Sequence, residues 1–435
     1  MSSFVAVRPI LHAALALGAI LHAAASVAAE PLTLPVAQRR ALERSLLMRA
    51  QDASVTASRE MSIAAGQLPD PVVKLGIDNL PVEGSDGFSL TRDFMTMRRI
   101  GVMQEVTRAD KREIRSERFE REAERALAEK GVAAAQIARD AALAWLDRWY
   151  AEAMSAQIGE QVKLASREIE AAESAYRSGR GSQADVFAAQ SMLAQLRDRG
   201  SEIAKKMRTA QTALVRWVPE AADLPLAALP DIDALDLPAH AVDAHIARHP
   251  EVAVLAKQEE IAATDARLAQ AAKQSDWTWE LSFQQRGPAY SNMVSIGVSI
   301  PLQWDQARRQ DRETAAKLAL VDEARARREE TIRTHVAELK AMLVDWESGR
   351  ERRLRYQREL LPLAANRTEA LLSAYRTGRA SLADVLAAER NEADVKLQLL
   401  QLELDIARAW AQITFLIPHD ATAGTGYAAV RKELP

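Results

Sequence analysis

One uninterrupted stretch constrains the fold of this 435-residue chain more than any other: residues 107–178 contain no proline and only two glycines. The whole chain is rich in Ala, Arg, Glu and Leu and has 5% aromatic residues, which is typical of long, closely packed helices. A continuous helix of about 70 residues is about 105 Å long. Because no compact globular core accommodates that length, we expect a coiled coil or a helical tube.

A segment that begins near the end of this stretch occurs twice in the chain. The copies, AYRSGRGSQADVFAAQ at 175–190 and AYRTGRASLADVLAAE at 374–389, are 199 positions apart and match at 11 of 16 positions. Each copy has a glycine that can end one helix and a serine that can cap the next. These residues are Gly179 and Ser182 in the first copy, and Gly378 and Ser381 in the second. We therefore expect two helical hairpin tips and an internal duplication.

The duplication predicts how the chain is organised. Residues 30–238 form the first repeat, with a helix, two strands and a long helical hairpin, and residues 239–418 form the second. Residues 419–435 are a short C-terminal tail. The returning helix after each tip carries apolar residues three and four positions apart, which is a heptad pattern and predicts a coiled coil. Glu392 makes one layer of the second pattern polar.

The first 29 residues have the pattern of a signal peptide. Arg8 precedes an apolar segment at 10–21, and small residues at 27–29 precede Glu30. This apolar segment is too short for a membrane anchor, and no later run reaches the length of a spanning helix. We expect an exported protein, and the absence of cysteine excludes a lipoprotein anchor.

Composition and motifs argue against several classes of protein. The net charge of −3 gives no basic surface for nucleic acid. No segment matches a phosphate-binding loop, a nucleophile elbow or a metalloprotease helix, so we do not expect an enzyme or a cofactor. His240, His245 and His249 lie close in sequence, but spacings of five and four do not share one helical face. We interpret them as a solvent-facing helix start and expect no metal site.

Four segments alternate apolar and polar residues and predict strands. Trp277, Trp279, Leu281 and Phe283, for example, alternate with polar residues. A soluble β-sandwich shows the same alternation, but beside an export signal and very long helices it favours a lipid-embedded barrel around water. A single-chain barrel has at least eight strands, so three chains that share twelve strands satisfy the pattern. The predicted strands are 72–79, 96–106, 277–284 and 294–302.

With these elements in order, the chain resembles the TolC family of outer-membrane efflux factors. The most specific match is Tyr-x-x-Gly followed by Asp-Val in each tip, at Tyr176 and Asp185 and at Tyr375 and Asp384. The resemblance implies a mainly α protein with a small β part, whose long hairpins form a trimeric α-barrel below a shared 12-stranded transmembrane β-barrel. It implies a homotrimeric passive duct in the outer membrane that extends into the periplasm. Its implied partners are a periplasmic adaptor protein and an inner-membrane pump.

The resemblance also implies that the tips hold the entrance closed or contact the adaptor. The residues concerned are Tyr176, Arg180, Asp185, Tyr375, Arg376, Arg379 and Asp384. Arg379 lies one position before the family's arginine site, which is Ala380 here, and the second acidic site is Ala387. The arginines also suit plain solubility at an exposed turn, and the aspartates suit the positive end of a helix dipole.

The cargo remains open at this stage. Residues 70–84 and 89–105 look most like the heavy-metal branch of the family, which works with resistance-nodulation-division pumps. A multidrug or type I secretion duct of the same fold is the alternative. A periplasmic coiled-coil scaffold or adaptor also explains the helices, but it leaves the four strands unexplained.

Overall fold

A computed structural model of the chain describes residues 30–235, 237 and 241–416. The predicted signal peptide and the tail at 419–435 lie outside the described residues. The chain forms two compact units, and each contains segments of both predicted repeats. Helices α3 (Ala109–Arg177) and α7 (Gln310–Arg355) contribute to both units. Unit 1 contains residues 30–44, 140–234 and 348–411, and unit 2 contains residues 45–139, 235–347 and 412–416, apart from the gaps above.

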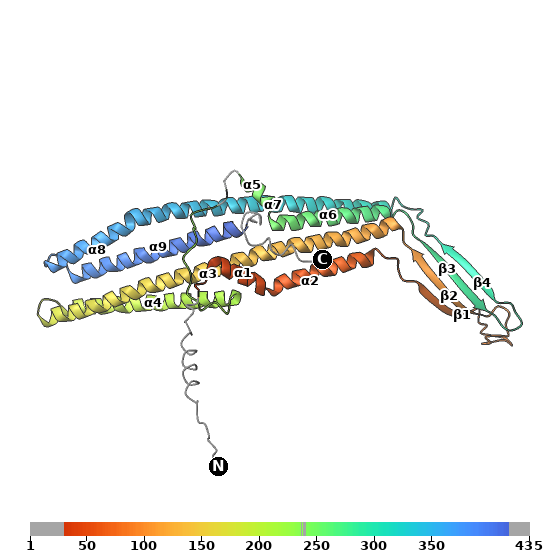
Figure 1. Cartoon of the computed structure of the whole chain (residues 1–435), viewed down its shortest axis with the longest axis horizontal. Helices are drawn as coiled ribbons and strands as arrows, with labels where there is room; N and C mark the ends of the chain where they lie inside the picture. Colours follow the sequence, from red (N-terminus) through yellow and green to blue (C-terminus); the bar gives the residue numbers. More distant parts are fainter. Residues whose placement is uncertain (1–29, 236, 238–240, 417–435) are drawn as a thin grey trace, which may run out of the picture. The chain divides into compact units, whose positions relative to one another are not determined.

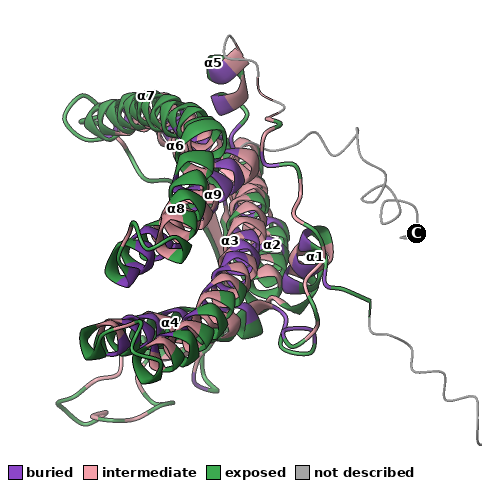
Figure 2. Cartoon of the chain, turned by 90° about the vertical axis from the view of Figure 1, so that its left-hand side faces the viewer, coloured by how far each residue is buried: buried purple, intermediate pink, exposed green. Residues whose placement is uncertain are grey.

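Unit 1 is built from helices. It contains α1 (Leu34–Arg44), α4 (Gln183–Trp217), α8 (Leu361–Arg376) and most of α9 (Leu382–Leu416), together with the ends of α3 and α7 (Figure 1). The helices carry buried residues on one side and exposed residues on another, as amphipathic helices do (Figure 2). The largest fully buried side chains include Trp145 and Tyr150 of α3 and Leu214 of α4.

Irregular chain in unit 1 is held to these helices by buried polar contacts. The Trp145 indole donates a hydrogen bond of 2.8 Å to the Leu32 carbonyl. The buried Arg148 guanidinium donates to the carbonyl oxygens of Ala222 and Leu224. Further along, Arg353 donates to the Asp233 carboxylate at 2.6 Å. These bonds fix the segment before α1 and the segment after α4 on the helices, because buried carbonyl groups need hydrogen-bond partners.

Unit 2 combines helices with a single four-stranded sheet. Its helices are α2 (Leu46–Ala65), the short α5 (Val242–Ile246), α6 (Pro250–Ala271) and the first parts of α3 and α7. The Asp265 carboxylate of α6 pairs with Arg118 of α3 at 2.6 Å and with Lys317 of α7 at 3.3 Å. One acidic side chain thus joins three helices of the unit.

The sheet is antiparallel, in the order β1-β2-β3-β4, as the alternating sequence predicts. The strands are β1 (Val72–Asp78), β2 (Met97–Val106), β3 (Trp277–Gln285) and β4 (Met293–Ser299). The fourth strand ends before its predicted limit, because Pro301 has no backbone N–H to donate. β1 and β4 are the edge strands.

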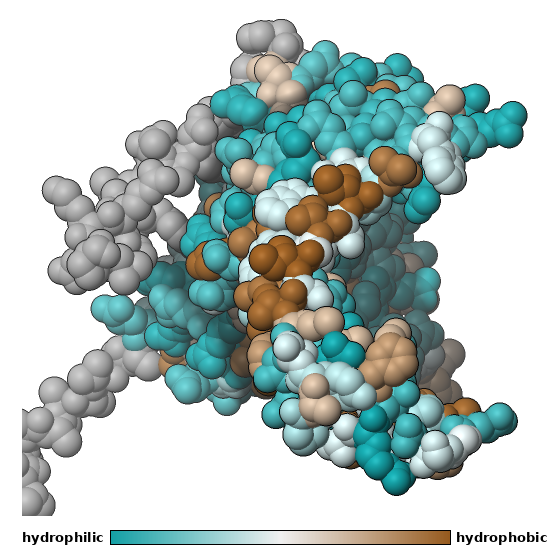
Figure 3. All heavy atoms as spheres, turned by 90° about the vertical axis from the view of Figure 1, so that its right-hand side faces the viewer, coloured by the Kyte–Doolittle hydropathy of each residue, from teal (hydrophilic) through white to brown (hydrophobic). Residues whose placement is uncertain are grey.

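The two faces of the sheet differ in chemistry. The register aligns Val73, Val102, Leu281 and Ile296 in one row across all four strands, and every member of that row is exposed. Hydrophobic side chains form a continuous band on this face in Figure 3. The opposite face carries ion pairs, such as Lys74 with Glu280 at 2.7 Å and Arg99 with Asp78 at 3.3 Å. The alternation predicted for β3 is confirmed.

Several helices of the chain are separated by breaks. α1 and α2 are separate because Ser45, extended at φ −65° and ψ 120°, caps α2. α5 and α6 are separated just before His249, which caps α6, and Pro250 is the first residue of α6. A π-helical turn at Tyr356–Leu360, just before Pro362, separates α7 from α8. Among the described residues, no helix is long and apolar enough to span a membrane.

Candidate functional site

The first hairpin tip is a tight turn between α3 and α4. Gly179 has φ +70°, the left-handed conformation that glycine adopts most easily, and its N–H bonds to the Tyr176 carbonyl at 3.0 Å. Ser182 then caps α4. Its hydroxyl accepts the Asp185 N–H at 3.2 Å, and the Asp185 carboxylate accepts the Ser182 N–H at 2.8 Å. This reciprocal capping box fixes where the returning helix begins.

The second tip, between α8 and α9, repeats this geometry. Gly378 has φ +71°, and its N–H bonds to the Tyr375 carbonyl at 3.0 Å. The Asp384 carboxylate accepts the Ser381 hydroxyl at 2.6 Å, while the Ser381 hydroxyl accepts the Asp384 N–H at 3.1 Å. The duplicated sequence therefore produces two hairpin tips with the same turn, as predicted, and both belong to unit 1.

The cap contacts shift the acidity of the second aspartate. The Ser381 hydroxyl and then the Ser381 backbone N–H hold the pKa of the Asp384 carboxyl below its usual value, with a further contribution from the charge of Arg367. Asp384 therefore stays negatively charged through the whole neutral range. A fixed anion at the start of α9 suits the helix dipole and is also available to a cation from outside the chain.

Most of the other predicted tip residues are exposed to solvent, and Tyr375 is half-buried. Tyr176 is 49% exposed, and Arg180, Arg376 and Arg379 are exposed. Within the described residues, none of these three arginines has an ion-pair partner, and neither tyrosine hydroxyl has a hydrogen bond. The nearest contact is from Arg180 to the Ser178 hydroxyl of the same tip, at 3.2 Å. The structure thus gathers the seven residues into two separate tips, and no described bond joins one tip to the other.

Just behind the tips, the two hairpins do contact each other. Arg390 of α9 donates to Gln195 of α4 at 3.3 Å, and Arg199 of α4 pairs with Asp394 of α9. Sequence analysis identified neither pair, because each joins residues about 195 positions apart. The contacts set the two tips side by side within unit 1.

A buried pair of carboxyl groups at this interface was also missed. Glu389 of α9 is only 8% exposed and shares a hydrogen bond with Glu168 of α3. Burial, followed by the hydrogen bond and the charge of Glu168, raises the pKa of Glu389 to about 9. Glu389 follows the apolar Val385 by four positions, which was the available signal that it lies on the packed face of the helix.

The chain was compared with protein families and with curated proteins. Residues 241–418 match the family described as outer membrane efflux protein, whose members are transport proteins rather than enzymes. Among curated proteins, none matches the sequence.

Solved structures match nearly the whole chain. CusC, described as forming a transmembrane channel, is 15% identical, with a TM-score of 0.75 over 89% of this chain and 92% of that one. The outer membrane protein VceC of Vibrio cholerae is 18% identical, with a TM-score of 0.71 over 88% of this chain and 95% of that one. The outer membrane channel CmeC of Campylobacter jejuni is 11% identical, with a TM-score of 0.73 over 88% of this chain and 85% of that one.

At these identities the structural matches establish the fold alone. The described chain thus has the fold of these outer-membrane channels, and residues 241–418 match the outer membrane efflux protein family.

Proposed function

We propose that the protein is the outer-membrane channel of a tripartite efflux system and acts as a passive duct from the periplasm through the outer membrane. The observation that carries this proposal is the two-faced sheet. Its apolar face is exposed, with Ile296 at 80%, while the opposite face holds ion pairs. Such a sheet suits lipid on one side and water on the other.

The sheet also supports a homotrimer. Its edge strands β1 and β4 have unpaired backbone groups on their outer sides, and an open edge is not tolerated in lipid. Pairing β1 of one copy with β4 of the next closes the sheet. Three copies give a barrel of twelve strands, which is wide enough for an aqueous lumen.

We place the closing and docking functions at the hairpin tips. Arg180, Arg376 and Arg379 have no ion-pair partner in the part of the chain that the structure describes. They and the hydroxyls of Tyr176 and Tyr375 are available for bonds to neighbouring chains or to a periplasmic adaptor that links the duct to an inner-membrane pump. Asp185 and Asp384 serve as caps and offer a further carboxylate oxygen. Charge-assisted bonds between helices are directional and breakable, which suits a gate.

For cargo, we propose heavy-metal cations, on the resemblance of residues 70–84 and 89–105 to the heavy-metal branch. An efflux-deficient strain that expresses the duct with its adaptor and pump should gain tolerance to divalent metals such as zinc, cadmium or cobalt. Tolerance to organic drugs without any gain toward metals would assign a multidrug duct instead.

The duct itself is tested by the oligomer mass and the planar-bilayer conductance of the protein purified in detergent. We expect a trimer that gives small, cation-preferring currents. A water-soluble monomer without conductance would overturn the proposal and favour a periplasmic scaffold.

A further inference from the structure

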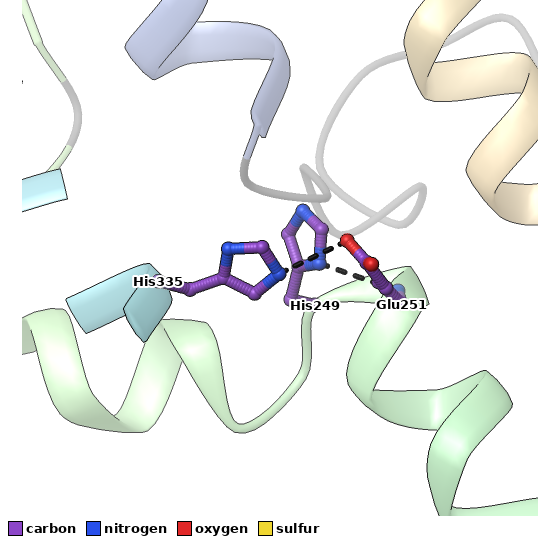
Figure 4. Close-up of side chains that lie close together, drawn as sticks. All are labelled: His249, Glu251 and His335. Carbon is purple, nitrogen blue, oxygen red and sulfur yellow. Dashed lines mark hydrogen bonds and ion pairs between the residues drawn. The ribbon is translucent and has the colours of Figure 1, made fainter. Parts of the chain in front are cut away.

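A cluster of histidine and glutamate side chains lies in unit 2, outside the sheet. His249 is the residue before α6 and is 6% exposed, and His335 lies in the middle of α7 with 13% of its side chain exposed. The centres of the two imidazole rings are 4.9 Å apart. Figure 4 shows both rings and the Glu251 side chain turned toward one another.

The donor atoms of this cluster are close enough to share one ion. One nitrogen each from His249 and His335 and one carboxylate oxygen from Glu251 all lie within 4.8 Å of one another. Tetrahedral zinc holds its nitrogen and oxygen ligands about 2.0–2.2 Å away, hence about 3.4 Å from each other. The Glu251 side chain is half exposed, so its carboxylate is free to make the inward movement that this geometry requires.

His335 has the arrangement of a histidine prepared for a metal. Its Nδ1 lies 3.1 Å from a carboxylate oxygen of Glu338, and its Nε2 faces Glu251 at 3.0 Å. Metal-binding histidines commonly donate one ring N–H to a carboxylate, which orients the ring and leaves the other nitrogen to bind. Glu338 occupies that supporting position.

The buried His249 supplies the second imidazole. It is 6% exposed, and its ring centre lies 4.9 Å from that of His335. Its Nδ1 accepts the Glu251 N–H at a long 3.2 Å, a contact that a cation can replace at little cost.

We propose that His249, His335 and Glu251 bind one zinc ion, with a water molecule as the fourth ligand and Glu338 as the supporting carboxylate. The ion clips the start of α6 to the middle of α7 and so stabilises unit 2. This is a resident site that does not depend on what the duct exports.

The test uses the full chain, purified in detergent with an affinity tag that contains no histidine and then stripped of metal with a chelator. Zinc is titrated in competition with a chromogenic chelator. We expect one zinc ion per chain in the wild type. H335Q and H249N should each lower the affinity by about 100-fold or more, and E338Q by about 10-fold. Asn at 249 still caps the helix, so H249N separates ligand loss from loss of the cap.

His245 provides the matched control, since it lies four residues before His249 and bonds to the Ala241 carbonyl instead. H245N should bind zinc like the wild type. If H335Q proves unstable when metal-free, E251Q removes a ligand at constant size and should also weaken binding. Cobalt gives an independent readout, because a four-coordinate nitrogen and oxygen site produces visible absorption that H249N should abolish. Equal zinc affinity in the wild type, H335Q and H249N would overturn the site, as would an equal loss in H245N.

Discussion

At the residue scale, the buried pair of Glu389 and Glu168 makes stability depend on pH. The second carboxyl oxygen of each residue has no partner among the described residues, so a negative charge on both would be costly. The raised pKa of about 9 means that folded Glu389 keeps a proton that the unfolded chain loses above pH 4.5. The free energy of unfolding therefore falls as pH rises between those values.

E389Q should remove this pH dependence. The amide keeps the shape and donates to Glu168 without titrating, so we expect an unfolding temperature at least about 2 °C above wild type at pH 8 and little difference below pH 4.5. Thermal unfolding followed by circular dichroism across this range is the measurement.

Glu392, three residues after Glu389, is a control because its pKa is shifted in the opposite direction. Burial alone would raise its pKa, but hydrogen bonds from Lys396 and Thr368 hold the pKa below its usual value. E392Q should therefore destabilise the protein at neutral pH, and the loss should shrink on acidification. The same pH profile for E389Q and E392Q would refute our account of the pair.

The tip residues allow a second test at this scale, because capping and gating can be separated. S381A removes the cap hydroxyl but keeps the charge of Asp384, whereas D384A removes the charge and leaves the Ser381 hydroxyl to accept the backbone N–H of residue 384. Y375F removes a hydroxyl that has no described bond within the chain. If the tips close the duct, D384A and Y375F should raise single-channel conductance more than S381A. An S381A increase as large as that of D384A would mean that only the helix start matters.

At the scale of the element, the sheet predicts opposite outcomes for adjacent substitutions. Ile296 lies on the apolar face, and its neighbour Ser295 lies on the polar face, where it bonds to Gln284. An arginine on a lipid-facing surface costs about 2–4 kcal/mol near the membrane centre. I296R should therefore sharply reduce the protein recovered in outer membranes, while S295R should leave most of it there. Equal recovery would show that this face does not meet lipid.

The π-helical turn before Pro362 allows a second prediction at the scale of the element. Proline lacks an N–H and collides with the carbonyl four residues earlier, which disturbs the helix at that point. The equivalent position in the first repeat is Lys163, inside the unbroken α3. P362A should raise the unfolding temperature, and K163P should lower stability by about 3 kcal/mol or more. An unchanged or lower stability of P362A would show that other contacts impose the turn.

At the scale of the whole molecule, the central prediction is that three chains assemble. Two copies with different tags are co-expressed equally and captured through the first tag. Random trimers then contain the first and second tags at about 4:3, whereas dimers give about 2:1 and monomers none of the second. Quantitative blotting of the captured protein measures the ratio.

Several features of the protein could be predicted because local patterns in the sequence encode them. Proline-free runs gave the long α3, the repeated Gly and Ser residues gave two capped tips, and alternation gave the four strands with their two faces. The family resemblance followed, because those elements come in a fixed order. In each case the residues concerned lie within a few positions of one another, so that local geometry alone decides the outcome.

Contacts between residues far apart in the sequence could not be predicted and became visible in the folded chain. The prediction that His249 faces solvent with the other histidines near it in sequence is wrong. His249 is 6% exposed and lies beside His335, and Glu251 contacts the same His335 ring from 84 positions away in the sequence. Glu389 is buried because Glu168 packs against it from another helix. A carboxyl or imidazole group changes its chemistry through the groups that surround it, and helical periodicity does not specify which groups those are.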